Sequence, residues 1–293
     1  PGRASWPVLA VLLLPALAVY GFFVIYPIAQ SLRFSVYRWN GLGPLTDFIG
    51  LDNFAEALGS SDFRAAILHC FIIAGLSLLL QLPFALALAV ILNQKLVGRR
   101  FLRTMFFAPY VLSEVVTGVV WRQILRPGGL ADEVIQFGGS IIPGLGPEAV
   151  DEFIRPWLGD PDVALYSLFF VLTWKYFGLH MVLLLAGLQQ IPKDLTEAAA
   201  IDGAGPWQTF RYVTLPLLGP TIRISVCLMI IGSLHVFDLV WVTTKGGPIG
   251  STQTMATYLI DFGFGRNRFG YAGALSIVIF SLSMVLALLY QRY

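Results

Sequence analysis

Five ionisable side chains interrupt the long apolar runs of this sequence, and their types could do chemistry. They are Glu114, Lys175, His180, His235 and Asp238. A charged side chain at membrane depth is costly, so each of them is a functional candidate by default. The two acids and the lysine could relay ions across the membrane, but they could equally form ion pairs with one another or extend their charged ends toward water. His69 and His180 share no ligand-like spacing with other side chains, so we interpret both as hydrogen-bonded bundle residues rather than metal ligands.

The composition indicates which elements must position these side chains. The chain has 293 residues, of which 57% are hydrophobic and 12% charged, and its mean hydropathy is +0.75. Soluble domains carry about 25% charged residues, so the composition excludes that class. A net charge of +2 without a basic tract argues against nucleic acid as a partner. Cys70 and Cys227 lie inside apolar runs, and we interpret them as buried small residues rather than a disulfide.

Apolar runs recur at the length that spans a bilayer as helix, about 20 residues. We expect six spans, at 7–31, 65–93, 103–126, 163–190, 217–241 and 270–291. No soluble domain fits between them, so the sequence predicts one all-helical transmembrane domain over 1–293. The first run follows only Arg3 and lacks a small-residue cleavage site, which favours a retained span over a signal peptide.

The basic residues indicate the orientation of these spans. With both termini inside the cell, the inner and the outer segments each hold nine Lys and Arg residues, but the outer segments are longer. The tightest cluster, KLVGRRFLR at 95–103, falls in a short inner loop, where basic residues count most. We therefore expect both termini inside, which places residues 191–216 in the cytoplasm.

Residues 197–216, EAAAIDGAGPWQTFRYVTLP, lie between the fourth and fifth runs and are too polar to cross a membrane. Asp194 and Glu197 have the spacing of a capping box, so a helix is predicted to start at Asp194. The alanines at 198–200 favour helix and leave a surface with little side-chain bulk.

Gly203 and Gly205 are predicted to end that helix. Pro206 suits the first position of a second short helix, which would run to about Val213. The predicted product is a bent two-helix element with a surface of small residues. It could dock another protein, or it could pack only on its own bundle.

Residues 48–58, FIGLDNFAEAL, form a shorter amphipathic pattern in an outer segment. Asp52 or Asn53 could cap this helix. Its apolar residues share one face, away from Glu56: Phe54, Ala57 and Leu58. The helix is too short to span, so we expect it to lie on the outer surface.

The 197–216 stretch resembles the EAA motif of binding-protein-dependent ABC importer permeases. The shared residues are Glu197-Ala198-Ala199, Gly203 and Leu215-Pro216, with Val213 where that family has isoleucine. DGAGPWQTFRYVTLP as a whole resembles the carbohydrate branch of the family, the maltose and glycerol-phosphate type. Further matching phrases are TKGGP at 244–248, GLDNF at 50–54 and APY at 108–110. The resemblance covers the second to the sixth span.

The resemblance implies a fold and a set of partners. The fold would be that of a type I ABC importer permease with six transmembrane helices, in the plasma membrane of a prokaryote. The chain would form a heterodimer with a second homologous permease and assemble with two cytoplasmic ATP-binding subunits and an extracellular solute-binding protein. It would be a transport subunit and not an enzyme, since no GxxxxGK[ST] motif occurs. ATP and Mg would bind the partner ATPase subunits, and this chain would bind no cofactor.

The resemblance also implies where partner and solute would bind. The EAA element at about 191–216 would dock on the ATPase through six residues: Glu197, Ala198, Ala199, Asp202, Gly203 and Gly205. The solute path would lie midway along the two spans that flank the element. Thr173, Tyr176 and His180 share a helix face on the fourth span. Met229, Ser233 and Val236 share one on the fifth, where Gly232 leaves room beside them. Aromatic rings and hydroxyls suit a sugar. Plain helix packing stays open as the alternative, because Ser, Thr and Gly also mediate it.

The predicted function is therefore the transmembrane subunit of an ABC importer for an oligosaccharide. A permease for glycerol-3-phosphate is the nearest alternative, although a phosphate ester would favour extra cations and only Lys175 is well placed. An ion-coupled secondary transporter, with Glu114, Lys175 and Asp238 as its relay, is the alternative from another class. It leaves the EAA element unexplained, and the sequence shows no inverted repeat.

Overall fold

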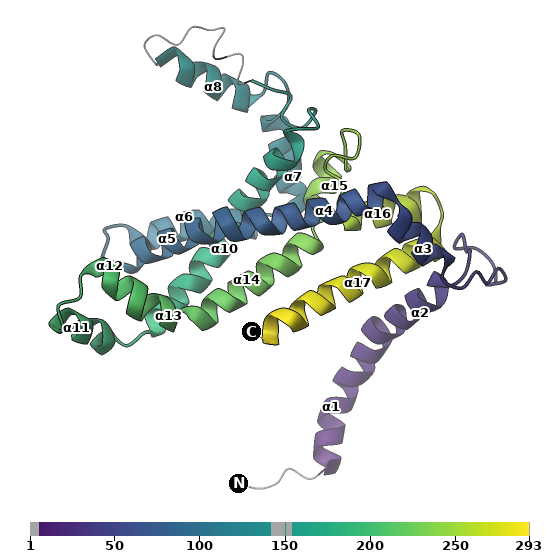
Figure 1. The fold of residues 1–293 in the computed structure, drawn as a ribbon, viewed down its shortest axis with the longest axis horizontal. Coiled ribbons are helices and arrows are strands. Elements are labelled where there is room, and N and C mark those ends of the chain that lie inside the picture. Colours follow the sequence, from purple (N-terminus) through teal and green to yellow (C-terminus); the bar gives the residue numbers. More distant parts are fainter. Residues whose placement is uncertain (1–5, 142–149, 151–153, 293) are drawn as a thin grey trace. The chain divides into compact units, whose positions relative to one another are not determined.

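The computed structural model describes residues 6–141, 150 and 154–292, with side chains from residue 11 onward. The described residues form helices and connecting loops (Figure 1). Along the chain these elements are α1 (Trp6–Tyr20), η1 (Gly21–Ile25), α2 (Tyr26–Ser35), α3 (Asp52–Gly59), α4 (Ser61–Leu76), η2 (Ser77–Gln81), α5 (Leu82–Asn93), α6 (Arg99–Val111), α7 (Glu114–Ile124), α8 (Leu130–Ile141), α10 (Ala164–Gln190), α11 (Lys193–Ile201), α12 (Pro206–Thr209), η3 (Phe210–Thr214), α13 (Leu215–Leu217), α14 (Gly219–Leu234), α15 (Asp238–Thr243), α16 (Met255–Ile260), η4 (Asp261–Gly265) and α17 (Phe269–Arg292). The elements labelled η are single π-helical turns.

Five helical runs in the described part of the chain are long and apolar enough to cross a membrane. They are Val11–Ser35, Ser61–Asn93, Ala164–Gln190, Gly219–Thr243 and Phe269–Arg292. Each coincides with an expected span to within a few residues. The all-helical membrane class predicted from composition is therefore confirmed.

The third expected span differs from a straight helix over 103–126. The chain instead forms α6 and α7, which are bent by 97° at Leu112 and Ser113. Pro109 lies inside α6 and has no N–H to donate, which weakens the helix ahead of the bend. The Nζ of Lys175, in α10, donates to the Leu112 carbonyl that the break leaves without a helical partner. The expected span at 103–126 is therefore a bent pair of helices, and the described chain has six spans if this pair is one of them.

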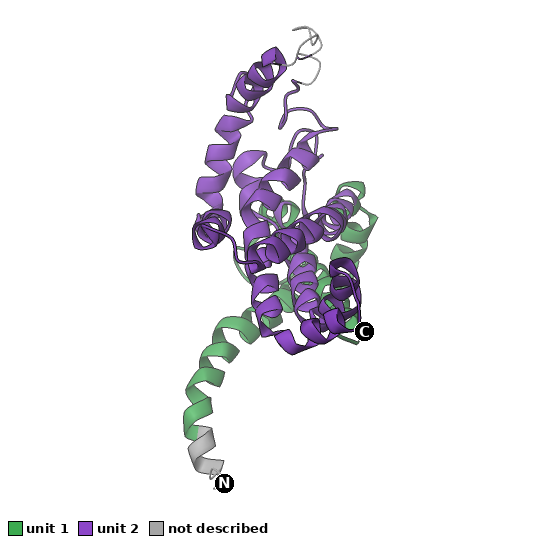
Figure 2. Cartoon of the chain, turned by 90° about the vertical axis from the view of Figure 1, so that its left-hand side faces the viewer, with its two compact units in different colours: residues 1–64, 258–293 green, residues 65–257 purple. Residues whose placement is uncertain are grey.

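Contacts divide the chain into two compact units (Figure 2): residues 1–64 with 258–293, and residues 65–257. In the larger unit, α10 is the most buried helix and packs against α5, α6 and α14. Glycines allow these helices to approach closely. A Cβ on Gly178 would lie 2.0 Å from the Phe106 carbonyl oxygen of α6, and one on Gly187 would lie 2.4 Å from Oγ1 of Thr221 in α14.

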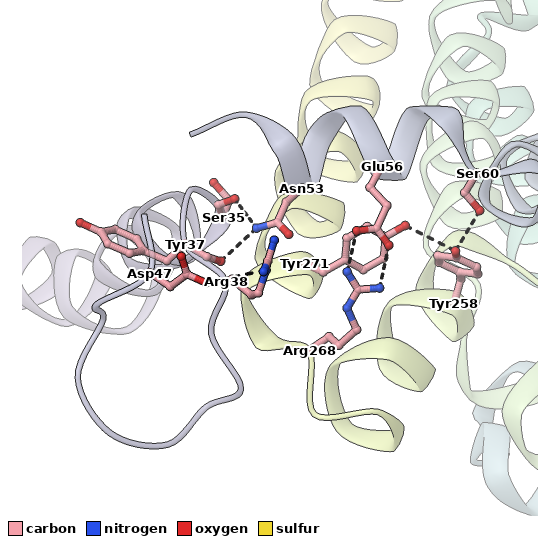
Figure 3. Close-up of polar contacts among 10 residues, drawn as sticks. All are labelled: Ser35, Tyr37, Arg38, Asp47, Asn53, Glu56, Ser60, Tyr258, Arg268 and Tyr271. Carbon is pink, nitrogen blue, oxygen red and sulfur yellow. Dashed lines mark hydrogen bonds and ion pairs between the residues drawn. The ribbon is translucent and has the colours of Figure 1, made fainter. Parts of the chain in front are cut away.

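In the smaller unit, α17 packs against α2 and α3. A Cβ on Gly270 would lie 2.0 Å from the carbonyl oxygen of Tyr37, so only glycine fits there. The outer helix is present as α3, but neither Asp52 nor Asn53 caps it as expected. Asn53 is buried instead, and its Nδ2 donates to the carbonyls of Ser35 and Tyr37 at 2.8 and 3.0 Å (Figure 3). The cap prediction was wrong because these carbonyls take up the Asn53 amide.

Candidate functional site

The polar stretch after α10 folds as a bent helical element, made of α11, α12, η3 and α13. Helix α11 begins at Lys193, directly after Pro192, so Asp194 lies inside its first turn. No side chain caps the helix, and the predicted Asp194–Glu197 capping box is therefore not formed. Asp194 still lies at the positive end of the helix, where an acid is favourable.

The end of α11 is formed as the glycines predicted. Gly203 has a φ of +81°, in the left-handed region that favours glycine. The Gly203 N–H donates to the Ala200 carbonyl at 3.1 Å, and the Ala204 N–H donates to the Ala199 carbonyl at 2.9 Å. This pair of hydrogen bonds is the Schellman motif, which satisfies the last carbonyls of a helix.

The second half of the element turns at Gly205 and Pro206. Pro206 is the first residue of α12, as predicted. The side-chain Oε1 of Gln208 accepts the Gly205 N–H at 2.8 Å, so a helix-start donor is satisfied. The chain then passes through η3 and α13 into α14.

This element has no buried residue among α11, α12 and η3, all of which are described. Of the six residues predicted to dock, Ala199 and Gly205 are half-buried and the other four are exposed: Glu197, Ala198, Asp202 and Gly203. Three large apolar side chains beside them face outward. Ile201 is 86% exposed, Trp207 72% and Tyr212 74%. The element therefore presents an apolar surface that the described chain itself does not cover.

A cavity of about 330 Å³ lies in the larger unit, between residues of the second to the fifth span. Six of the seven residues predicted to line the solute path border it: Tyr176, His180, Met229, Gly232, Ser233 and Val236. The seventh, Thr173, does not border it. The two helix faces chosen from their spacing therefore meet at one space, and both flank the exposed element in the sequence.

Three polar residues that border the cavity were missed. Ser77 and Gln81 are buried and belong to the π-helical turn η2, and Tyr110 belongs to α6. Ser77 and Gln81 are four residues apart in an otherwise apolar run, a spacing that places both on one helix face. That spacing was the available signal, because polar groups inside a span usually face the bundle interior.

Polar contacts gather at the bend between α6 and α7. Glu114 is the first residue of α7, at the positive end of that helix, and the Tyr176 hydroxyl donates to its Oε1. The rings of Tyr110 and Tyr176 lie edge to face, with centroids 6.0 Å apart. Lys175 neither extends to water nor ion-pairs within the described chain, since its Nζ is taken up by the Leu112 carbonyl. These contacts hold the bend against α10 beside the cavity.

The histidines differ from one another. His69 is a hydrogen-bonded bundle residue as expected, with Nδ1 2.8 Å from the Gln253 carbonyl oxygen. His180 is buried, but its Nδ1 has no hydrogen-bond partner in the described structure, so that expectation was wrong for His180. His235 and Asp238 lie at the break between α14 and α15, and both border the cavity. No group of three or more His, Cys, Asp or Glu among the described residues could hold a metal ion.

Comparison with known proteins identifies the family of this chain. The family described as binding-protein-dependent transport system inner membrane component matches residues 81–293. The diacetylchitobiose uptake system permease protein NgcF of Streptomyces coelicolor is 31% identical, over 93% of this chain and 78% of its own length. The lactose transport system permease protein LacF of Rhizobium radiobacter is 32% identical, over 94% of this chain and 90% of its own length.

A solved structure gives the same fold. It is a chain of a bacterial ABC transporter involved in the import of the acidic polysaccharide alginate, with a TM-score of 0.82 at 23% identity. The match covers 97% of this chain and 94% of that one. The family expected from the EAA motif is confirmed, and with it the all-helical permease fold. This chain belongs to the family of inner membrane components of binding-protein-dependent transport systems and is a multi-pass permease subunit of a prokaryotic ABC importer, not an enzyme.

Proposed function

We propose that this permease forms half of the path for a saccharide and couples that path to an ATPase through residues 191–216. One observation carries the proposal: α10 and α14 border the cavity, and they are the two long helices joined by the exposed element. A displacement of the element therefore pulls directly on two of the helices that line the path.

The cavity has the chemistry of a saccharide site. Tyr176 and Tyr110 offer ring faces for the C–H surface of a sugar, and Ser233, Ser77 and Gln81 offer groups that donate or accept hydrogen bonds. A volume of about 330 Å³ is at the small end of the range for ligand sites. Relatives named for lactose and for diacetylchitobiose support a saccharide as the solute.

The exposed element supports the docking of an ATP-binding subunit. A knob of small residues, Ala198 and Ala199, lets another backbone approach, while the Schellman turn at Gly203 fixes the bend of the knob. Ile201 and Trp207 supply apolar surface next to it. This partner lies in the cytoplasm when both chain termini do, as the basic loop at 95–103 indicates.

The exposed apolar surface of the first span is evidence for further partners. Residues 11–25 are apolar and none of them is buried, with Phe23 70% exposed. In the assembly this surface is covered by lipid and by a second, homologous permease. The complete importer then contains two permeases, two ATP-binding subunits and an extracellular solute-binding protein. ATP and Mg bind the ATPase subunits.

The docking of the ATPase is tested by recovery of the purified complex. Ala198→Trp places a large side chain on the exposed face of α11 and is expected to reduce co-purification of the ATPase at least tenfold. Ala55→Trp, at an exposed alanine of α3, is the matched control and leaves recovery unchanged. Transport is tested by measuring the uptake of saccharides into proteoliposomes that contain the complex, with the binding protein outside and ATP on the side of the ATPase subunits. Full recovery with Ala198→Trp, or a transporter that imports no saccharide, contradicts the respective half of the proposal.

A further inference from the structure

The charges around the cavity are unequal in sign. Two carboxylate side chains border it, Glu114 from the start of α7 and Asp238 from the start of α15. Among the described residues that line the cavity, none is Lys or Arg. The polar groups that remain are hydroxyls, an amide and two imidazoles, so the permanent charge of the lining is negative.

Lys175 lies close to Glu114, but it does not border the cavity. Its side chain is buried and borders a separate hollow on the Leu112 side of the bend. Its ammonium donates to the Leu112 carbonyl. It can offset part of the Glu114 charge at a distance, but its ammonium is taken up by the Leu112 carbonyl and Lys175 does not border the cavity.

The two imidazoles belong to His180 and His235. The two carboxylates are the acidic side chains of the described lining, and no Lys or Arg borders the cavity beside them. A carboxylate accepts hydrogen bonds from sugar hydroxyls strongly, since bonds to charged acceptors are the stronger ones. An anionic solute in the same cavity would instead be repelled by the two carboxylates, and the described lining has no Lys or Arg to pair with it.

We propose that Glu114 and Asp238 make this cavity selective against anions, so that the transported saccharide carries no carboxylate, phosphate or sulfate group. The inference rests on the proposed function, in which the cavity is the solute path. It separates this chain from the alginate importer that shares its fold, because an acidic polysaccharide would be rejected here. Glycerol-3-phosphate is rejected on the same ground.

A charge probe placed in the cavity tests the inference without knowledge of the solute. Gly232 borders the cavity and has nothing within 4 Å of an added Cβ, so Gly232→Cys introduces a thiol without a clash. In the purified importer, with Cys70 and Cys227 replaced by alanine, the thiol is treated at pH 8 with a cationic and an anionic methanethiosulfonate reagent. The ratio of the two rates is compared with that at Ile249→Cys, a position that is 96% exposed.

Clefts lined by one sign of charge raise the local concentration of counter-ions by about tenfold or more. We expect the cationic reagent to be favoured about tenfold at position 232 relative to position 249. Neutralising both acids, by Glu114→Gln with Asp238→Asn, is expected to remove most of that preference. Glu133→Gln, at an exposed acid that does not border the cavity, leaves it unchanged.

Each outcome decides a different statement. A ratio of the two rates at position 232 that equals the ratio at position 249, or a preference that survives the double neutralisation, overturns the charge selectivity and leaves the path in place. A thiol at position 232 that reacts with neither reagent shows that the cavity is not on an aqueous path, which overturns the proposed path as well. Mass spectrometry of the solute retained by the binding protein gives a second test, and an acidic saccharide found there would overturn the selectivity.

Discussion

Glu56 and Arg268 stand 212 positions apart in the sequence and form a two-pronged ion pair (Figure 3). Nη1 of Arg268 donates to Oε1 of Glu56 at 2.7 Å, and Nη2 donates to Oε2 at 2.6 Å. The guanidinium also lies over the ring of Tyr271, 4.5 Å from its centroid. Because Glu56 belongs to α3 and Arg268 directly precedes α17, the pair fixes the short outer helix to the last span within the smaller unit.

The pair makes stability depend on pH. The hydrogen bonds from Arg268 lower the pKa of Glu56 from its ordinary value of 4.5. A lowered folded-state pKa contributes stability that is present above the unfolded value and is lost as the pH falls through the folded value. Since both side chains are more than one third exposed, solvent screening limits the contribution at pH 7 to about 0.5–1 kcal/mol.

Glu56→Gln is therefore expected to lower the Tm of the purified protein at pH 7, and the deficit should shrink as the pH falls below about 4. High salt should shrink it as well, because the pair is exposed. Thermal unfolding measured from pH 3 to pH 8 checks both trends. The control is Glu133→Gln, at an exposed acid of α8. A deficit that is constant across this pH range would mean that the glutamate acts through packing alone.

A second prediction concerns the bend between α6 and α7. Lys175→Met removes the donor to the Leu112 carbonyl and leaves that acceptor without its partner. The bond is part-buried and its donor is charged, and such hydrogen bonds contribute about 1.5–3 kcal/mol, so the free energy of unfolding should fall by up to that amount. Lys95→Met, at an exposed lysine, is the matched control and should change it little. A variant at position 175 as stable as its control would show that the bend does not need this hydrogen bond.

The bend also shows where prediction from sequence stops. The five long apolar spans follow from apolar length alone, because any such run must satisfy its backbone as helix in a bilayer. The break at Leu112 depends on a lysine 63 positions away in another helix, and no local pattern encodes that contact. Pro109 signals weakness in the helix but not the direction or size of the bend.

The candidate site divides in the same way. Helical spacing placed Tyr176, His180 and Ser233 on faces that border one cavity, because α10 and α14 are regular there. Ser77 and Gln81 were missed, and they lie where a π-helical turn changes which residues share a face. The cap predictions failed for a different reason: Asn53 is recruited by carbonyls outside its own helix. Glycine ends, such as Gly203, were predicted correctly because backbone conformation is a local property.

A third prediction concerns the close approach of α10 to α6. Gly178→Ala would place a Cβ 2.0 Å from the Phe106 carbonyl oxygen, so one helix must move. Overpacking of this kind costs about 1–3 kcal/mol, and the Tm should fall accordingly. Gly75→Ala, in α4, is the matched control, since an added Cβ there meets nothing within 4 Å. Equal thermal stability of the two variants would contradict the close packing of α10 on α6.

A fourth prediction concerns orientation. Gln208 and Ile249 lie on the two sides of the span Gly219–Thr243, so they must face opposite sides of the membrane. With both termini inside, an impermeant thiol reagent added to intact cells, or to spheroplasts where an outer membrane is present, should label Ile249→Cys and not Gln208→Cys. Inside-out vesicles should reverse the result, which serves as the control. Labelling of position 208 from outside would invert the topology and remove the cytoplasmic docking role of the 191–216 element.

The last prediction separates solute binding from packing at Tyr176. Tyr176 packs against the core of the larger unit and borders the cavity, and its hydroxyl donates to Glu114. Tyr176→Phe keeps the ring and removes only the hydroxyl, so packing is preserved. A hydrogen bond to a charged group is worth about 1.5–3 kcal/mol. If the hydroxyl holds the Glu114 carboxylate in position to accept hydrogen bonds from the solute, uptake of saccharide should fall about tenfold or more.

The comparison that decides the point is uptake against thermal stability. Tyr176→Phe should lower uptake about tenfold or more, while the assembled complex loses no more stability than its hydrogen bond to Glu114 contributes, about 1.5–3 kcal/mol. Tyr166→Phe, on an exposed part of the same helix, is the control and should affect neither quantity. Ser233→Leu should block the path from the facing helix, α14. If Tyr176→Phe loses more stability than that hydrogen bond contributes, or loses no uptake, Tyr176 acts as a packing residue and the path must be assigned to the remaining cavity residues.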